Sequence, residues 1–304
     1  MSEGRDHTEG RATPVAPDDS KRAPGSAKVV SQQHELFQRI QQSEGEKIHW
    51  KLEALRASYH VFSQNHVELC KSIEHFEAQQ NVHRYWLIEE RERLSAFQFE
   101  NMRLFHNFLA GAFTLVDHTR ILVRELYAQH AFLAEYRKRV DHDFSTSDIA
   151  GFVKGLRNWM VHRGLVPVKV QASLSAGKLV ASIVLDLEQL GTGDRWDPRG
   201  RRYLSDATAP LRLKDVVNSY YDHVESFYSW LGNRMAQIHA PALEELDRLQ
   251  KQLRAMLPTP HMEALRRLAS RRFFQRLRLR PKPLISSNLS QHMTTCLYGY
   301  VAHG

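Results

Sequence analysis

The sequence predicts an all-α protein, an antiparallel helical bundle with a β-hairpin inserted before its last long helix. Three observations support this fold class. Apolar residues recur every three or four positions over three long stretches, which is the spacing of an amphipathic helix. Between residues 166 and 186 the apolar period changes to two, which is typical of strands. Glycine and proline gather between these stretches rather than within them, so the chain is divided into elements that can pack side by side.

The first helical stretch covers about residues 29–80. Its apolar residues follow helical spacing throughout, so we predict one long helix, interrupted if anywhere at Gly45. The residues expected in its core stripe are Leu36, Ile40, Ile48, Leu52, Leu55, Tyr59, Phe62, Val67, Leu69, Ile73 and Phe76.

The second helical stretch covers about residues 83–140, and if it lies antiparallel to the first, the two form half of a bundle. The charged run at residues 89–93 indicates a solvated face on the opposite side. Its expected core residues are Trp86, Leu94, Phe97, Leu104, Phe108, Leu115, Leu122 and Leu126.

A short third helix is predicted from about Ile149 to His162. Ser147 or Asp148 is a suitable N-cap, and Gly164 stands where a C-terminal glycine would end the helix. Two alternating runs then flank a short turn at Ala176–Gly177, which predicts a hairpin over about 166–186. Residues 189–210 resemble a loop, and a last helix is expected over 213–256, with Pro241 as a point of bending.

The two ends of the chain differ from the body at residues 29–256. Residues 1–28 are rich in Gly, Pro, Ser and charges without apolar periodicity, so we expect a disordered tail. The chain carries a formal net charge of +8. Residues 264–282 of the basic C-terminal tail (257–304) account for it, since they hold no acid and eight basic residues: Arg266, Arg267, Arg271, Arg272, Arg276, Arg278, Arg280 and Lys282.

Three interpretations of the basic tail stay open. Arginines interleaved with Phe273 and Phe274 suit a nucleic-acid phosphate backbone, which predicts salt-sensitive RNA binding. The same composition suits a helix lying on an anionic membrane surface. It also suits a terminal helix whose apolar residues pack on the bundle while the arginines stay in water.

Composition excludes several classes of protein. Two cysteines, Cys70 and Cys296, cannot build a disulfide framework or a cysteine zinc site, and they fit a reducing compartment. The chain lacks an apolar run of about 20 residues and a secretory signal, so we expect no stable membrane insertion and a cytoplasmic location. Neither H-E-x-x-H nor a phosphate-binding glycine loop occurs, and Asp141-His142-Asp143 resembles a loop, so we predict no metal and no cofactor.

The candidate chemistry lies in Arg157-Asn158-Trp159-Met160-Val161-His162, at the end of the third helix. Asn158 and His162 are four residues apart and therefore share a helix face, whose rim the side chain of Arg157 can reach. An imidazole titrates near neutrality, so His162 can act as a general acid or base. Arg157 can bind a phosphate in bidentate fashion, and Asn158 can orient either group. Arg157, Asn158 and His162 are therefore the predicted catalytic residues.

This motif resembles the signature of the HEPN superfamily, in which a polar residue follows an arginine and a histidine comes four to six residues after it. Its position at the end of the third helix of a bundle strengthens the resemblance, which spans roughly residues 31–256 in architecture. The resemblance implies metal-independent RNA cleavage by a homodimer whose motifs face each other. His162 would move the proton at the ribose 2′-hydroxyl or the leaving oxygen, and Arg157 would stabilise the scissile phosphate. The expected product ends in a 2′,3′-cyclic phosphate.

By analogy alone, the resemblance suggests a bacterial defence or stress function. The hairpin and loop before the last helix depart from the minimal four-helix form of the superfamily. The main alternative function is a non-catalytic helical interaction module. In that case Arg157 and His162 would cap carbonyls or pair with acids, and the tail would recruit a protein partner.

A second polar stripe runs through the otherwise apolar segment 104–122. Asn107, Gly111, Thr114 and His118 fall on one face of the predicted helix. One interpretation is that Asn107, Thr114 and His118 line the same pocket as Arg157 and His162. The other is that Gly111 and Thr114 allow close helix packing, while Asn107 and His118 form ordinary hydrogen bonds.

Overall fold

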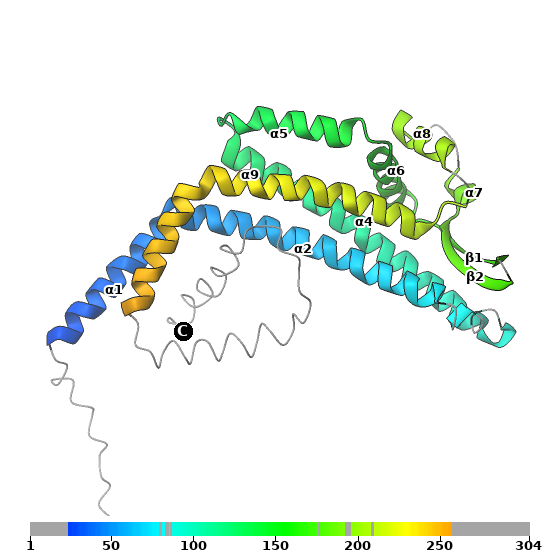
Figure 1. Ribbon diagram of the computed structural model, residues 1–304, viewed down its shortest axis with the longest axis horizontal. Helices are drawn as coiled ribbons and strands as arrows, with labels where there is room; N and C mark the ends of the chain where they lie inside the picture. Colours follow the sequence, from blue (N-terminus) through cyan, green and yellow to red (C-terminus); the bar gives the residue numbers. More distant parts are fainter. Residues whose placement is uncertain are drawn as a thin grey trace, which may run out of the picture.

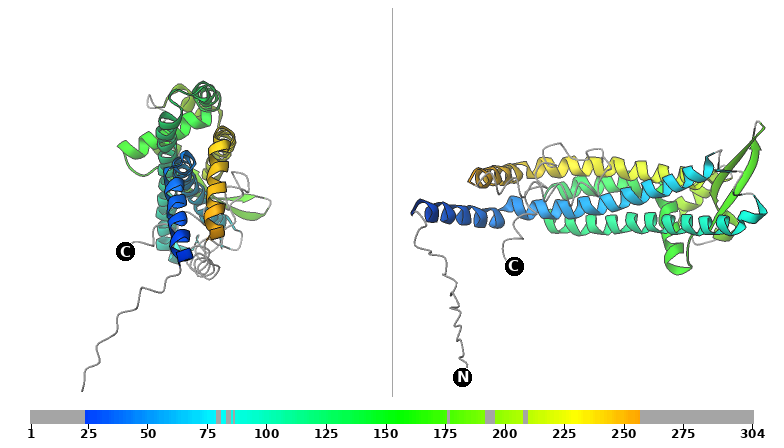
Figure 2. Two further views of the ribbon diagram at one scale, coloured as in Figure 1. Left: turned by 90° about the vertical axis from the view of Figure 1, so that its left-hand side faces the viewer. Right: turned by 90° about the horizontal axis from the view of Figure 1, so that it is seen from below.

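The computed structural model describes residues 24–256, apart from 79–80, 83–84, 86, 176, 192–195 and 208–209. Three long helices run side by side: α2 (Glu44–Glu77), α4 (Arg91–Tyr127) and α9 (Leu213–Met256). Helix α1 (Pro24–Gln42) extends the bundle at one end, where it lies along the last turns of α9 (Figures 1 and 2). The predicted helical fold with a hairpin before the last long helix is confirmed.

Aromatic side chains fill the interior between the three long helices. Phe62 of α2 is fully buried, with ring centroids 5.1 Å from Phe108 of α4 and 5.5 Å from Tyr221 of α9. Thr119 of α4 shares a buried hydrogen bond of 2.5 Å with the hydroxyl of Tyr228 of α9. Burial of large apolar side chains dominates the stability of such a bundle, and satisfied polar pairs of this kind fix its register.

The helical stretch predicted over 29–80 is divided close to Gly45, the position considered for an interruption, and the break itself lies at Ser43. Its hydroxyl accepts a hydrogen bond from the Glu46 N–H at 3.1 Å, so Ser43 caps α2 instead of continuing α1. Gly45 is needed beside this break, since an added Cβ would lie 2.3 Å from the carbonyl oxygen of Ala242. Pro241, the predicted bending point, stands one residue earlier in α9.

On the far side of Ser43 and Pro241 from the three-helix bundle, α1 and the end of α9 form a two-helix arm with a small core of its own. Its buried residues are Leu36, Ile40, Leu246 and Leu249. The predicted disorder of residues 1–28 is wrong for 24–28, which begin α1, and residues 1–23 lie outside the described part of the chain.

The predicted second helix over 83–140 is also divided. A 3₁₀ turn (Ile88–Glu90) precedes α4, and a separate helix α5 (Phe132–Val140) follows it, ending in a π-helical turn (Asp141–Ser145). The break after Tyr127 has a local cause, because the ring of His130 accepts the N–H of Phe132 at 3.0 Å. The buried Phe132 ring then packs against Tyr127, with centroids 4.8 Å apart.

A lateral layer covers one flank of the long helices (Figure 1). It contains α6 (Asp148–His162), strands β1 (Val168–Ser175) and β2 (Lys178–Leu185), and helices α7 (Leu187–Leu190) and α8 (Pro198–Asp206). The strands form the predicted antiparallel hairpin, with Val168 opposite Leu185. The loop predicted for 189–210 is wrong at α8, which begins with Asp197 as N-cap and Pro198 at its first turn.

None of the helices in the described part of the chain is long and apolar enough to span a membrane.

Acidification is expected to destabilise the bundle through His239 of α9. Burial lowers the pKa of His239 below its ordinary value of 6.5, and the Tyr127 hydroxyl lies 2.8 Å from its Nε2. Above pH 6.5 the ring is neutral in both folded and unfolded chains, so it adds no pH dependence. As the pH falls below 6.5 the unfolded chain binds the proton first, and the free energy of unfolding decreases.

Urea unfolding at a series of pH values between 7.5 and about 5.5 measures this effect. The His239→Gln variant should lose less stability over that window than the wild type, whereas His75→Gln, at an exposed position, should behave like the wild type. Because burial also lowers the pKa of His66, part of the slope should persist in His239→Gln. If the free energy of unfolding depends on pH equally in the wild type and in His239→Gln, the contribution assigned to His239 is wrong.

Candidate functional site

Helix α6 presents the predicted motif, and both of its ends are fixed by local interactions. The Ser147 hydroxyl accepts the Ala150 N–H at 3.3 Å, which confirms one of the two predicted N-caps. The Arg163 N–H donates to the Trp159 carbonyl at 2.8 Å, and Gly164 follows with a φ of +138°. Gly164 therefore permits the left-handed turn that ends the helix directly after the motif.

The last two turns of α6 line a hollow with a volume of about 470 Å³. Asn158 and His162 are both exposed and both line it, as their spacing of four residues predicts. The other lining residues are Gly155, Trp159, Arg163, Leu190 and Trp196. The hollow thus combines an imidazole, an amide and a guanidinium with apolar and indole surfaces, a composition that suits one polar ligand with an aromatic part.

Arg157 lies apart from this hollow. Its guanidinium carbon is 5.1 Å from the ring centroid of Phe113 on α4, whereas that of Arg163 is 5.0 Å from the ring of Trp159 within the hollow. The structure therefore places Arg163, rather than Arg157, with Asn158 and His162. Among the described residues, neither Arg157 nor His162 forms an ion pair with an acid or caps a carbonyl.

Trp196 forms the inner wall of the hollow and is held on three sides. Its ring is 4 % exposed and stacks on Phe152, with centroids 5.1 Å apart, while its Nε1–H donates to the Gly191 carbonyl at 3.0 Å. On the third side the ring lies against Gly155, where an added Cβ would be 2.3 Å from the indole carbons. The glycine is therefore what allows the indole to approach α6 this closely.

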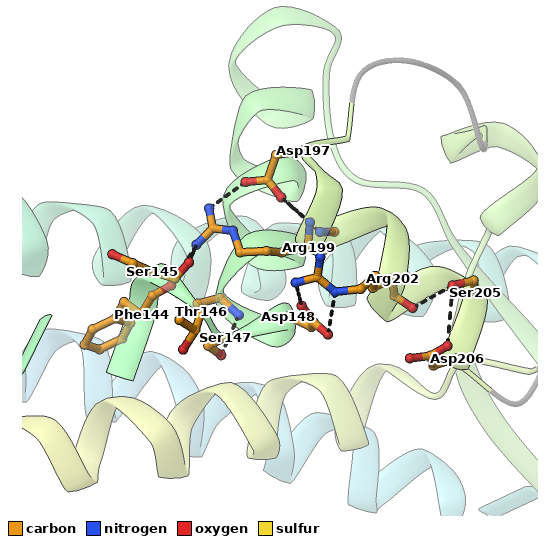
Figure 3. Close-up of polar contacts among 12 residues, drawn as sticks. Phe144, Ser145, Thr146, Ser147, Asp148, Asp197, Arg199, Arg202, Ser205 and Asp206 are labelled. Carbon is orange, nitrogen blue, oxygen red and sulfur yellow. Dashed lines mark hydrogen bonds and ion pairs between the residues drawn. The ribbon is translucent and has the colours of Figure 1, made fainter. Parts of the chain in front are cut away.

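Helix α8 is joined by two arginines to the start of α6 and to the π-helical turn that precedes it, as Figure 3 shows. Arg199 donates to the Phe144 carbonyl at 2.7 Å and to the Asp197 carboxylate at 2.6 Å. Arg202 pairs with Asp148, the first residue of α6, at 2.7 Å. The backbones approach closely here because Gly151 of α6 lies against α8. These contacts connect the segment that carries Trp196 to the helix that carries His162.

Asp197 remains ionised in this junction. Burial alone would raise its pKa, but the Gly200 and Arg199 N–H groups and the Arg199 guanidinium outweigh it and hold the pKa below the ordinary 3.8. The acid is thus a fixed structural anion at neutral pH.

The second polar stripe lines a different groove, which corrects the first interpretation of it. Asn107, Thr114 and His118 face α2 in a groove of about 420 Å³ that contains neither Arg157 nor His162. His118 shares a hydrogen bond of 2.6 Å with Ser58, and the Asn107 carbonyl accepts from the Asn65 side chain at 3.0 Å. Gly111 permits close packing on α2, since an added Cβ would lie 2.9 Å from Asn65. The stripe therefore has the packing role of the second interpretation.

Sequence reasoning missed Arg163, Trp159 and Trp196 as neighbours of His162. The available signal was the pair Gly151 and Gly155, four residues apart on one face of a short helix, which indicates another segment packed closely on that face. The arginines of the basic tail lie outside the described residues. Within the described residues, no group of three or more His, Cys, Asp or Glu side chains is arranged to hold a metal ion.

Comparison of the chain with protein-family models, with curated proteins and with solved structures finds no match in any of the three.

Proposed function

We propose that the chain is an RNA-binding protein that cleaves RNA by metal-independent general acid–base catalysis, as the resemblance to the HEPN superfamily implies. The observation that carries the proposal is the exposure of His162 and Asn158 together in a hollow that also holds Arg163 and Trp159. This set offers a proton carrier, a hydrogen-bonding amide, a cation for a phosphate and an aromatic surface for a base. These are the groups with which proteins recognise unstacked RNA.

The charge of the lateral layer supports an anionic ligand. Residues 148–206 contain 9 Lys and Arg against 6 Asp and Glu, whereas α9 contains 5 against 6. Several acids of the layer are already neutralised, since Asp148, Asp197 and Asp186 pair with Arg202, Arg199 and Lys169. Arg163, directly after the last residue of α6, is exposed and forms no ion pair with an acid in the described part of the chain.

In the proposed reaction, His162 either removes the proton from a ribose 2′-hydroxyl, with water protonating the leaving 5′-oxygen, or protonates that oxygen, with water taking the 2′-hydroxyl proton. The 2′-oxygen forms a bond to phosphorus as the bond to the 5′-oxygen breaks, which leaves a 2′,3′-cyclic phosphate. Arg163 binds the phosphate and stabilises its developing charge, and Asn158 orients the reacting groups. Arg157 lies outside the hollow, over the ring of Phe113, so the phosphate is assigned to Arg163 instead.

Purified full-length protein with excess EDTA should cleave a mixed pool of labelled RNAs and leave cyclic-phosphate ends. Once a cleavage position is known, the same RNA can be synthesised with a single 2′-deoxy nucleotide there. This RNA should bind to the protein but remain intact, because the attacking oxygen is absent. Arg163→Ala should weaken binding more than Arg157→Ala. Binding without cleavage at any pH between 5 and about 9 would remove the catalytic part of the proposal, and no binding at low salt would remove all of it.

A further inference from the structure

Strand β1 pairs with β2 on one edge and leaves its other edge open. The Asp186 N–H donates to the Pro167 carbonyl at 3.0 Å, so Pro167 directs its backbone carbonyl toward β2. Backbone groups alternate along an antiparallel strand, so those of Val168, Val170, Ala172 and Leu174 point away from β2. Among the described residues, none of these outward groups has a hydrogen-bond partner.

This edge lacks the usual features that prevent strand pairing between chains, namely proline, bulges and outward charges. The pairing with β2 is regular over all eight residues of β1, without a bulge or a proline. Its one charged residue, Lys169, is drawn toward β2 and α7 by Asp186 at 2.8 Å and Glu188 at 3.3 Å. The hairpin projects from the bundle (Figure 2), and Leu174 near its tip is 77 % exposed.

We propose that β1 pairs with β1 of a second copy of this chain, in antiparallel orientation, to form a continuous four-stranded sheet. The two-fold axis passes through Gln171, which places Val168 opposite Leu174 and Val170 opposite Ala172. In this register each of the four outward-pointing residues meets an outward-pointing residue of the other copy, so every open N–H and C=O along the edge gains a partner.

The side chains of β1 are compatible with this self-pairing. Val168, Val170, Ala172 and Leu174 share one face of the strand, so the exposed Leu174 would lie beside the base of the second copy's hairpin, at its buried Val168. On the other face Lys169 would lie opposite Ser173, and like charges do not meet. A second copy is therefore a better fit than an unrelated strand, because the sequence of β1 complements itself.

This interface does not depend on the proposed function, and it differs from the arrangement that the family resemblance implies, in which the motifs face each other. Because β1 begins six residues after His162, the sheet would still place two hollows in one assembly.

Sedimentation velocity of the full-length protein tests the interface. The wild type should sediment as a dimer at micromolar concentration. Ala172→Pro removes an outward N–H without removing a bond to β2, and Leu174→Lys places a charge at the edge, so each should weaken dimerisation about tenfold or more. The matched control is Val180→Lys, which changes an exposed residue of β2 on the same hairpin and should remain dimeric.

Cysteine cross-linking tests the register. In a Cys70→Ser, Cys296→Ser background, Gln171→Cys should form an intermolecular disulfide on mild oxidation. The two Gln171 residues would be a non-hydrogen-bonded pair, whose short Cα separation of about 4.5 Å suits a disulfide. A monomeric wild type would overturn the proposal, as would a dimer that survives both edge variants and shows no cross-link, since it would use another surface.

Discussion

Replacement of His162 by Ala is expected to lower the rate of RNA cleavage by a factor of about 10² to 10⁴, the usual contribution of a general acid or base. The change should leave the fold intact, because the His162 side chain is exposed at the end of α6 and forms no hydrogen bond among the described residues. RNA binding should fall much less than the rate, since Arg163 and Trp159 remain. Single-turnover cleavage assays and filter binding measure the two quantities separately.

His75→Ala provides the control, because His75 is an exposed histidine on α2, outside the hollow. It should retain the wild-type cleavage rate. If His162→Ala cleaves as fast as His75→Ala, the catalytic role of His162 is wrong. If His162→Ala instead lowers the melting temperature by several degrees, the residue is structural, as in the alternative interpretation of the motif.

Replacement of Trp196 by Ala is expected to lower the free energy of unfolding by about 3–5 kcal/mol, as for other fully buried large aromatic residues. The change removes one of the two rings stacked on Phe152, the other being Tyr203, and the inner wall of the hollow. Under the proposed function, RNA binding should also weaken. Trp50→Ala is the control, since Trp50 is 47 % exposed and its loss should change stability by about 0.5 kcal/mol or less.

A double-mutant cycle with Gly155 tests the cause. In the wild type, Gly155→Ala should destabilise by about 1–3 kcal/mol, because its methyl group cannot fit beside the indole. In the Trp196→Ala background the same change should stabilise by about 0.5–1 kcal/mol, because alanine is the better helix former and the obstacle is gone. Chemical denaturation of the four proteins measures the cycle. Effects of the same sign in both backgrounds would contradict the close contact.

Regular periodicity made the largest elements of the fold predictable from sequence. The last helix was placed at 213–256, where α9 lies, and the hairpin and the end of α6 were located from alternation and from Gly164. Gly45 indicates an interruption of the first stretch, but the apolar spacing continues through it and hides the exact position, Ser43, although the cap itself is a common Ser-x-x-Glu pattern. Helix α8 was missed because nine residues that start with proline are too few to show a period.

The candidate site was predictable only as far as one helix defines it. Spacing on α6 brought Asn158 and His162 together, since both belong to the same face. It could not place Arg157 over Phe113 or bring Trp196 beside His162, because those positions depend on contacts between segments distant in sequence. The two interpretations of the stripe of Asn107, Thr114 and His118 stay open from sequence for the same reason, as helical spacing does not say which neighbour a face meets.

The separate core of the two-helix arm has a consequence for cooperativity. The arm is held together by four buried residues: Leu36, Ile40, Leu246 and Leu249. They are separated from the main interior at the level of Ser43, where α1 ends and α2 begins, and of Pro241 within α9. Such a region opens as a local unit at a lower free energy than the whole molecule. The arm lies at the opposite end of the bundle from α6 and the hairpin (Figure 1). Amide hydrogens of the arm can therefore exchange with solvent while the hollow around His162 stays folded.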